Sequence, residues 1–220
     1  GYCSVGNSDI FIGREDGVNE KGVAVAMTAV KPKKVKPGIN FALATRCVLD
    51  KCANAEQGVK TLSGAHFLIT NSYLLADREG NMAVVEACPD KVRVREPEDE
   101  DNFIVCTNQF ALPEMLKMED QKERPPDSMA RYTAIYNALK QKKGRTETQD
   151  AQKILSDHRG YVCSHVEEIK LGTLWSMVAA LREPKIYIAE GHPCRTKYKE
   201  DTRLNKATKK RRTNETSSQR

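Results

Sequence analysis

The sequence predicts an α+β protein, in which blocks of strands and blocks of helices follow one another along the chain. Short apolar or alternating stretches typical of strands lie near the beginning, in the middle and near the end. Segments with apolar residues at helical spacing interrupt them in two blocks. A parallel sheet needs strands and helices in regular alternation, so this order argues against a βαβ architecture.

The composition is that of one folded domain of a soluble protein. A chain of 220 residues, 39% of them hydrophobic and 30% charged, is neither disordered nor embedded in a membrane. No apolar run approaches the ~18 residues of a transmembrane helix, and residues 1–4 show no signal pattern. The seven cysteines are scattered through apolar surroundings, which suits reduced thiols. We therefore expect a reducing, cytoplasmic location.

The net charge of +6 belongs to the end of the chain. Residues 195–220 hold ten Lys or Arg against three Asp or Glu, which leaves 26 basic and 27 acidic residues in 1–194. We expect residues 1–194 to form the domain and residues 195–220 to form a basic, disordered tail, because the run Lys209–Arg212 has no apolar periodicity. Such a run can also bind nucleic acid through charge alone, although a solvated end is the favoured interpretation.

The first third predicts two strands followed by two helices. Residues 9–13 and 22–30 are apolar or β-branched, and the turn-rich residues 14–21 lie between them, as in a hairpin. Pro32, Pro37 and Gly38 end this pattern. Apolar residues at helical spacing then predict helices over 39–52 and 55–62.

The middle third predicts a meander of antiparallel strands over 67–77, 82–88 and 92–95. The sequence Arg-Glu-Gly-Asn at 78–81 is typical of a tight turn between the first two. An acidic loop over 96–101 follows, and a further strand is expected over 103–107.

The last third predicts two helices and then two strands. The helices are expected over 129–142, with Asp127 or Ser128 as N-cap, and over 149–157, with Thr148 as N-cap. The strands are expected over 171–181 and 185–190.

Histidine and cysteine offer two candidate sites. Cys163 with His165, and His192 with Cys194, would bring together four zinc ligands if their segments met. Their spacings are tighter than those usual for structural zinc, so buried thiols beside histidines are favoured, and we assign neither metal nor cofactor. A cysteine nucleophile activated by histidine is the second candidate, but no local pattern supports it.

Two other residues suit acyl-transfer chemistry. Asn108 follows an apolar stretch, where its amide N–H can face a developing oxyanion, although a turn-forming Asn is the simpler interpretation. Arg131 lies in the first turn of a predicted helix, where an arginine is usually solvated.

Five stretches in order resemble one enzyme family, that of choloylglycine hydrolases, penicillin V acylases and isopenicillin N acyltransferases. They are the DGVNEKGVA hairpin at 16–24, LLADREG with MAVVE at 74–86, Thr107-Asn108, the Ser-x-x-Arg helix start at 128–131, and GTLWS at 172–176. The resemblance spans residues 4–194. It implies a four-layered αββα sandwich of the N-terminal-nucleophile class, which hydrolyses linear non-peptide amides or transfers their acyl groups.

The resemblance also implies roles for particular residues. An N-terminal cysteine attacks the amide in such enzymes, and its α-amino group, with a pKa of about 7.7–8.0, suits a general base. By position, Asn108 resembles the oxyanion-hole amide and Arg131 the arginine near the nucleophile. The second oxyanion donor, a backbone N–H, maps to Thr28 or Ala29, where many relatives carry Asn or Tyr; this difference leaves the substrate preference open.

We expect the nucleophile to lie in a companion segment before Gly1. The family's leading cysteine and its Arg-Asn-x-Asp segment have no counterpart here, and Cys3 precedes the wrong strand to replace them. The sequence thus predicts a fragment or split enzyme that acts on a small-molecule amide, inactive as it stands. The alternatives are an inactive ligand-binding homologue and, less favoured, a nucleic-acid-associated protein. A homo-oligomer is compatible with the sequence, and no membrane partner is expected.

Overall fold

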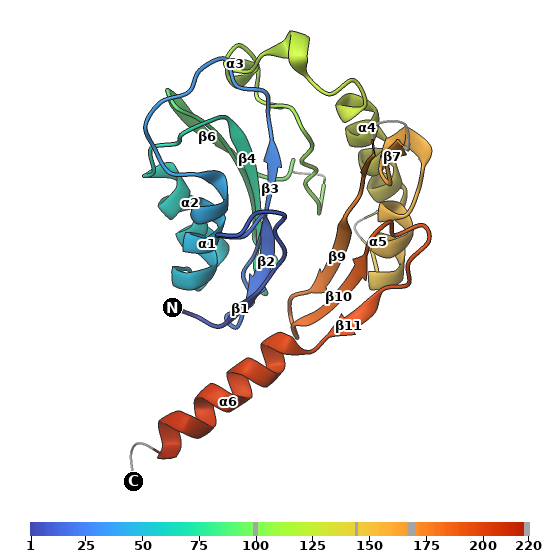
Figure 1. Cartoon of the computed structure of the whole chain (residues 1–220). Helices are drawn as coiled ribbons and strands as arrows, with labels where there is room; N and C mark the ends of the chain where they lie inside the picture. The colour runs from blue at the N-terminus through green and yellow to red at the C-terminus, as the bar shows by residue number, and fades with distance from the viewer. Residues whose placement is uncertain (99–100, 144, 167–169, 218–220) are drawn as a thin grey trace.

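The chain folds into four layers, helices on the outside and two sheets between them. The computed structural model describes residues 1–98, 101–143, 145–166 and 170–217. Helices α1 (Phe41–Lys51) and α2 (Ala55–Ser63) form one outer layer, and α4 (Ser128–Gln141) and α5 (Thr148–Leu155) form the other (Figure 1). The predicted α+β class and αββα sandwich are confirmed.

The larger sheet has six strands in chain order, and every neighbouring pair is antiparallel. Hairpin connections join most of them, whereas α1 and α2 are inserted between the third and fourth strands. The strands are β1 (Ser4–Val5), β2 (Asp16–Asn19), β3 (Ala24–Ala29), β4 (Asn71–Ala76), β5 (Met82–Cys88) and β6 (Lys91–Arg95).

Helices α1 and α2 cover one face of this sheet through its main apolar core. Side chains at alternating positions of the strands point to the helices, as the period of two requires. Each helix begins at an asparagine whose side chain accepts a backbone N–H, Asn40 for α1 and Asn54 for α2. The buried core includes Val25, Val48, Leu62, Tyr73, Leu75 and Val85.

The smaller sheet packs against the opposite face. Its order is β11-β10-β9, with β9 at Trp175–Ala180, β10 at Lys185–Glu190 and β11 at Lys199–Asp201. Val5 and Val18 of the larger sheet meet Ile186 and Ile188 of the smaller one in a second apolar cluster. The indole N–H of Trp175 also donates to Asp16 Oδ2 at 2.6 Å, so one polar contact links β9 to β2.

Short elements complete the chain. They are α3 (Pro113–Leu116), the 3₁₀ turns η1 (Gln121–Glu123) and η2 (Arg159–Tyr161), the ribbon of β7 (His165–Val166) and β8 (Leu171–Gly172), and α6 (Arg203–Ser217). Among the described residues, no helix combines the length and the apolar character needed to cross a bilayer.

The predicted strand at 9–13 is wrong. The first hairpin is formed by β2 and β3, and residues 9–13 form bends in which Phe11 and Ile12 are exposed. Gly13 has φ +98° and lies so close to Ala42 that any Cβ would clash with its backbone, so the chain turns there. Apolar character alone misled the prediction, because these residues cover no core.

The predicted strand at 103–107 is also wrong, since this segment has no regular secondary structure. Its carbonyl groups bond to side chains instead of to a neighbouring strand: Arg95 donates to Val105 O and Thr28 to Thr107 O. The strand expected over 171–181 is divided into β8 and β9 by a break at 173–174. Residues 99 and 100 of the acidic loop lie outside the described residues.

Three details at helix ends and in the C-terminal segment differ from expectation. The N-cap of α5 is Glu147, which forms a capping box with Asp150, instead of Thr148. Asp127, one of the two predicted candidates, does occupy the N-cap position of α4, but its side chain makes no capping hydrogen bond. Within residues 195–220, which we expected to lack regular structure, β11 pairs with β10 and α6 follows; Leu204 of α6 is buried between the sheets, which gives this segment an apolar anchor.

Candidate active site

The candidate site lies at the edge of β3 where β2 stops. Strand β2 pairs with β3 from Asp16 to Val18, and Glu15 still accepts the N–H of Met27 at 2.8 Å. The N–H of Val30 bonds to the opposite side, toward Thr70 next to β4. Because backbone groups alternate between the two sides of a strand, the N–H and C=O of Ala29 project toward the side that β2 has left. This geometry favours Ala29 over Thr28 as the main-chain donor.

Asn108 occupies that edge in place of a strand. Its side-chain Nδ2 donates to Ala29 O at 2.9 Å. An asparagine amide has two N–H groups, and this contact uses one of them. The second N–H and the N–H of Ala29 thus belong to neighbouring groups on one edge, which is the arrangement that a pair of oxyanion donors requires.

Arg131 fixes the orientation of the Asn108 amide. Its Nη2 donates to Asn108 Oδ1 at 2.8 Å, and its Nη1 forms an ion pair with Asp127. Both contacts follow from the helix, because Asp127 and Arg131 lie one turn apart at the start of α4. Arg131 is thereby a positioning residue for Asn108, and Asp127 in turn orients Arg131.

Thr28, near the end of β3, bonds to the irregular segment that precedes Asn108. Its hydroxyl donates to Thr107 O at 2.9 Å and lies 3.4 Å from the Cys106 thiol. Burial raises the pKa of Cys106, so this thiol stays protonated and is a poor nucleophile. Thr28 therefore supports the site through its side chain.

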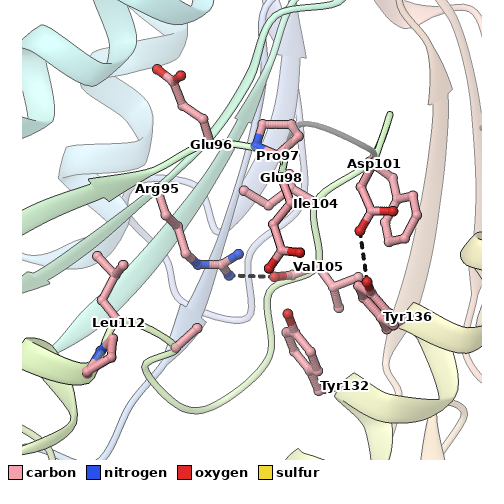
Figure 2. Close-up of a pocket in the computed structure, with 13 residues that line it drawn as sticks. Arg95, Glu96, Pro97, Glu98, Asp101, Ile104, Val105, Leu112, Tyr132 and Tyr136 are labelled. Carbon is pink, nitrogen blue, oxygen red and sulfur yellow. Dashed lines mark hydrogen bonds between the residues drawn. The ribbon is translucent and has the colours of Figure 1, made fainter.

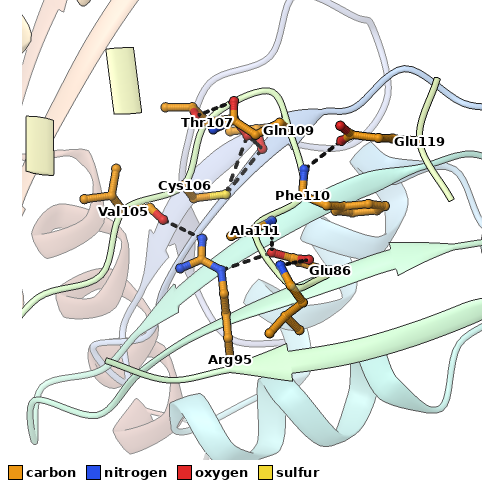
Figure 3. Close-up of polar contacts among 11 residues, drawn as sticks. Glu86, Arg95, Val105, Cys106, Thr107, Gln109, Phe110, Ala111 and Glu119 are labelled. Carbon is orange, nitrogen blue, oxygen red and sulfur yellow. Dashed lines mark hydrogen bonds and ion pairs between the residues drawn. The ribbon is translucent and has the colours of Figure 1, made fainter. Parts of the chain in front are cut away.

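A buried ion pair holds the segment on the other side of Asn108. Glu86 on β5 is fully buried and accepts from Arg95 Nε at 3.1 Å and from the N–H groups of Ala111 and Leu112 at 2.8 and 3.2 Å. Figure 3 shows Arg95 between Glu86 and the carbonyl of Val105. The loop that carries Asn108 is thus tied to β5 and β6 at both ends.

A cavity of about 350 Å³ lies beside this loop. Tyr132 and Tyr136 of α4 point into it, with Arg95, Ile104 and Val105 among the other residues that line it (Figure 2). The hydroxyl of Tyr136 donates to Asp101 Oδ2 at 2.9 Å. Tyr132 directly follows Arg131 in the sequence, so the cavity and the Asn108 network share the first turns of α4.

Glu15 is a titratable group close to the same edge. Burial and a hydrogen bond with Asp9 raise its pKa to about 7, and the neighbouring Asp16 carboxylate acts in the same direction. Its backbone pairs with Met27, two residues before Ala29. Glu15 is half-buried, and its carboxyl group changes charge near neutral pH.

Cys3 lies at the wrong end of the strands to act on a group bound at Ala29. Its backbone bonds to Glu20, and Ser4 pairs with Asn19, at the end of β2 that is distant from Asp16. Ala24, the partner of Val18, lies five positions before Ala29 on β3, which is about 17 Å at the usual rise per residue. The side chain of Cys3 packs against the cluster between the sheets.

All four predicted site residues, Thr28, Ala29, Asn108 and Arg131, are joined in one network by the contacts above. Sequence reasoning missed Asp127, Glu86 with Arg95, and Glu15. The spacing of Asp127 and Arg131 carried a signal, since it suits an i,i+4 ion pair. Glu86 and Arg95 gave none, because their meeting depends on the register of β5 with β6.

The layered architecture is that of the N-terminal-nucleophile hydrolases. Penicillin V acylase from Agrobacterium tumefaciens superposes with a TM-score of 0.54 at 19% identity, over 81% of this chain and 63% of that chain. A mutant of conjugated bile acid hydrolase from Clostridium perfringens gives 0.54 at 15% identity, over 91% and 81%. An N-acylethanolamine-hydrolyzing acid amidase orthologue from Caenorhabditis elegans gives 0.51 at 15%, over 81% and 78%.

Sequence comparison then gives the family. The family described as acyl-coenzyme A:6-aminopenicillanic acid acyl-transferase matches residues 1–195, and the chain belongs to it. Penicillin V acylase of Pectobacterium atrosepticum is 27% identical over 123 residues, which cover 47% of this chain and 32% of the relative. The chain therefore matches about a third of the length of that relative. The family is one of amide hydrolases and acyltransferases, which confirms the resemblance read from the five stretches.

Proposed function

We propose that this protein acts on the C–N bond of a small linear amide, as a hydrolase or acyltransferase. The observation that carries the proposal is the network in which Arg131 holds Asn108 against Ala29 at the open edge of β3. Membership of the family supports the reaction class. The residues at the site need no cofactor for this chemistry, because amide N–H groups stabilise an oxyanion by themselves.

In the proposed reaction, a cysteine thiolate attacks the amide carbonyl carbon. The carbonyl oxygen takes the negative charge and accepts hydrogen bonds from Asn108 Nδ2 and the N–H of Ala29. The α-amino group of the same cysteine, which took the proton of the thiol, gives it to the leaving nitrogen as the C–N bond breaks, and the acyl group stays on sulfur as a thioester. Water or another acceptor then removes the acyl group. Arg131 takes no part in bond making, but keeps the Asn108 amide in the required orientation.

The nucleophile is proposed to come from a companion segment that precedes residue 1 in the natural protein. Two thiols near the strands fit the role poorly, since Cys106 is kept protonated by burial and Cys3 lies at the far end of β2. A chain of residues 1–220 alone is then expected to be inactive, because the oxyanion donors provide only a small part of the rate.

The cavity lined by Tyr132 and Tyr136 is proposed to hold the acyl group. The aromatic rings of Phe103, Tyr132 and Tyr136 and the apolar side chains of Ile104 and Leu112 favour an apolar or aromatic chain. The named relatives act on penicillin V, conjugated bile acids and N-acylethanolamines, so these three amides are the first substrates to test. A reducing, cytoplasmic location stays part of the proposal, supported by seven free thiols. Proposed partners are limited to the substrate, the companion segment and a second copy.

The test uses the protein expressed from its natural start codon. Release of amine from the three amides is measured with and without iodoacetamide, which should abolish it. Asn108→Ala should lower kcat by about 10²–10³, the usual effect of removing one oxyanion donor. The control Asn102→Ala removes the same side chain at an exposed position outside the network.

Two results would contradict the proposal. Unchanged turnover in Asn108→Ala would remove the oxyanion role. Binding of all three amides with no release of amine, in protein that carries its complete N-terminus, would instead identify an inactive ligand-binding homologue.

A further inference from the structure

Three histidines and two cysteines lie close together near α4 and α5: His158, His165, His192, Cys163 and Cys194. None of them belongs to the Asn108 network. They come from three segments: the turn after α5, the ribbon of β7 and the turn after β10. The His165 ring lies 5.0 Å from that of His158 and 4.9 Å from that of His192, centroid to centroid. The sequence offered the meeting of Cys163 and His165 with His192 and Cys194 as a candidate and disfavoured it on spacing. It missed His158, which is absent from both short patterns.

Hydrogen bonds between the segments hold these side chains in place. Thr173 donates its N–H to Ser164 O at 2.9 Å, and Ser156 Oγ donates to Pro193 O at 3.1 Å. A Cβ at Gly172 would lie 2.3 Å from Cε1 of His192, so only glycine leaves room for that ring. The fold therefore fixes His165, His192 and Cys194, whereas His158 is the exposed member of the cluster.

The ligand atoms of His158, His165 and Cys194 all lie within 4.8 Å of one another, and His165 Nε2 is 3.8 Å from Cys194 Sγ. Around tetrahedral zinc, the usual bond lengths place a nitrogen about 3.6 Å from a sulfur and two nitrogens about 3.4 Å apart. One separation thus already fits, and the longest needs a closure of at most about 1.4 Å, which the exposed His158 can supply by a change of side-chain torsion.

Two further groups border this triad. Cys163 is buried, and a side-chain hydrogen bond joins it to Cys194. Its thiol is thus placed to support Cys194 as a metal ligand, because hydrogen bonds to ligand atoms orient them. His192 Nδ1 is buried with no hydrogen-bond partner in the part of the chain that the structure describes.

We propose that His158, His165 and Cys194 bind a zinc ion. Two imidazoles and one thiolate form a borderline-soft set that suits Zn²⁺ better than Mg²⁺ or Ca²⁺. Three protein ligands leave a fourth position, which water or the neighbouring His192 can fill. The ion would join the turn after α5 to the end of β10.

The turn that carries His158 also packs against α4. Gly160 of η2 packs so tightly on this helix that a Cβ would lie 2.5 Å from Cβ of Ala134 and 2.6 Å from the carbonyl oxygen of Ala130. Ala130 precedes Arg131. A zinc ion that fixes the turn at His158 would therefore steady the helix that presents Arg131, although the zinc proposal itself is independent of the reaction proposed above.

The test measures metal in protein purified under reducing conditions. Wild type should carry about one equivalent of zinc by mass spectrometry, and the cobalt-substituted protein should show thiolate-to-metal charge-transfer absorption. Cys194→Ser and His165→Ala should lose both signals. The controls Cys47→Ser and His66→Ala, whose side chains lie outside the cluster, should keep them.

Circular dichroism checks that each variant is folded, and His158→Asn, at the most exposed ligand, provides a third variant if the others unfold. Wild-type protein without zinc that also fails to bind added Zn²⁺ or Co²⁺ would overturn the proposal. So would charge-transfer absorption that persists in Cys194→Ser, or a Cys163–Cys194 disulfide in the reduced preparation.

Discussion

At the scale of single residues, Asn108 joins three distant parts of the chain through one amide. Its Nδ2 bonds to β3 and its Oδ1 to α4, while its own backbone belongs to the loop tied down by Glu86 and Arg95. Both ends of the amide of this loop residue are thereby held by hydrogen bonds. Preorganised donors of this kind stabilise a developing charge without further rearrangement.

Glu15 makes the stability of the folded protein depend on pH. Its pKa is raised from 4.5 to about 7 in the folded chain, so the folded state holds a proton that the unfolded state releases. Stability from this group is complete below pH 4.5 and is lost as the pH rises through about 7. We expect the melting temperature to fall between pH 5 and pH 8, and to fall less in Glu15→Gln. Thermal unfolding at both values measures the difference.

The matched control is Glu183→Gln, which changes an exposed glutamate in the turn between β9 and β10. It should retain the wild-type pH dependence. Equal slopes for wild type and Glu15→Gln would show that Glu15 titrates at an ordinary value.

At the scale of elements, the stretch NEKG at residues 19–22 forms the turn between β2 and β3, and its side chains explain how this turn is stabilised. Asn19 is fully buried, and its Nδ2 donates to the carbonyls of Leu49 and Cys52 at 3.0 and 2.8 Å, at the end of α1. Its Oδ1 accepts the N–H groups of Lys21 and Val23 within the turn. Gly22 has φ +82°, which favours glycine. The stretch therefore stabilises the fold by joining the hairpin to a helix end.

Asn19→Asp should lower the free energy of unfolding by about 2–4 kcal/mol, because a carboxylate cannot donate to the two carbonyls and brings negative charge to a helix C-terminus. Urea titration followed by circular dichroism measures the change. Asn102→Asp, at an exposed position, should change the free energy by less than about 0.5 kcal/mol. A loss of similar size in both variants would contradict this account.

Elements with a strong local pattern could be predicted from the sequence. The helices α1, α2 and α4 and the strands β5 and β10 lie where apolar spacing placed them, within two residues at each end. The strands expected at 9–13 and 103–107 failed for a non-local reason. Both are apolar, but an element becomes a strand only if a neighbour pairs with it, and Arg95 and Thr28 side chains take that role at 103–107.

Some residues of the candidate site could also be predicted from the sequence, whereas others required the structure. Asn108 and Arg131 were singled out by their chemistry and by the family resemblance, and the structure places them in contact. The choice of Ala29 over Thr28 needed the position at which β2 ends, which no local pattern gives. The cluster around His165 needed three segments to meet, so short spacings argued against it.

At the scale of the whole molecule, the two sheets are held together mainly by apolar packing. Val5, Val18, Ile186, Ile188 and Leu204 form the shared cluster. Trp175 and Asp16 add a hydrogen bond of 2.6 Å. Burial raises the pKa of Asp16, and hydrogen bonds from Trp175 and Asn7 oppose that rise. The polar link thus supplies a donor to the Oδ2 atom of a partly buried carboxylate.

Trp175→Phe keeps an aromatic ring but removes the donor. We expect the free energy of unfolding to fall by about 1–3 kcal/mol, the usual contribution of a hydrogen bond to a charged group. Urea titration followed by circular dichroism is the measurement. Tyr161→Phe removes a polar group from an exposed ring and should have little effect. Unchanged stability in Trp175→Phe would mean that the link between β9 and β2 contributes nothing.

Trp175 is the sole tryptophan of the chain, and it sits between the two sheets. Its emission therefore reports on their separation in particular. A shift of that emission to longer wavelength before the circular dichroism signal changes would reveal a state in which the layers have parted while their strands and helices persist. The protein thus carries an intrinsic fluorescent probe at the interface between its two sheets.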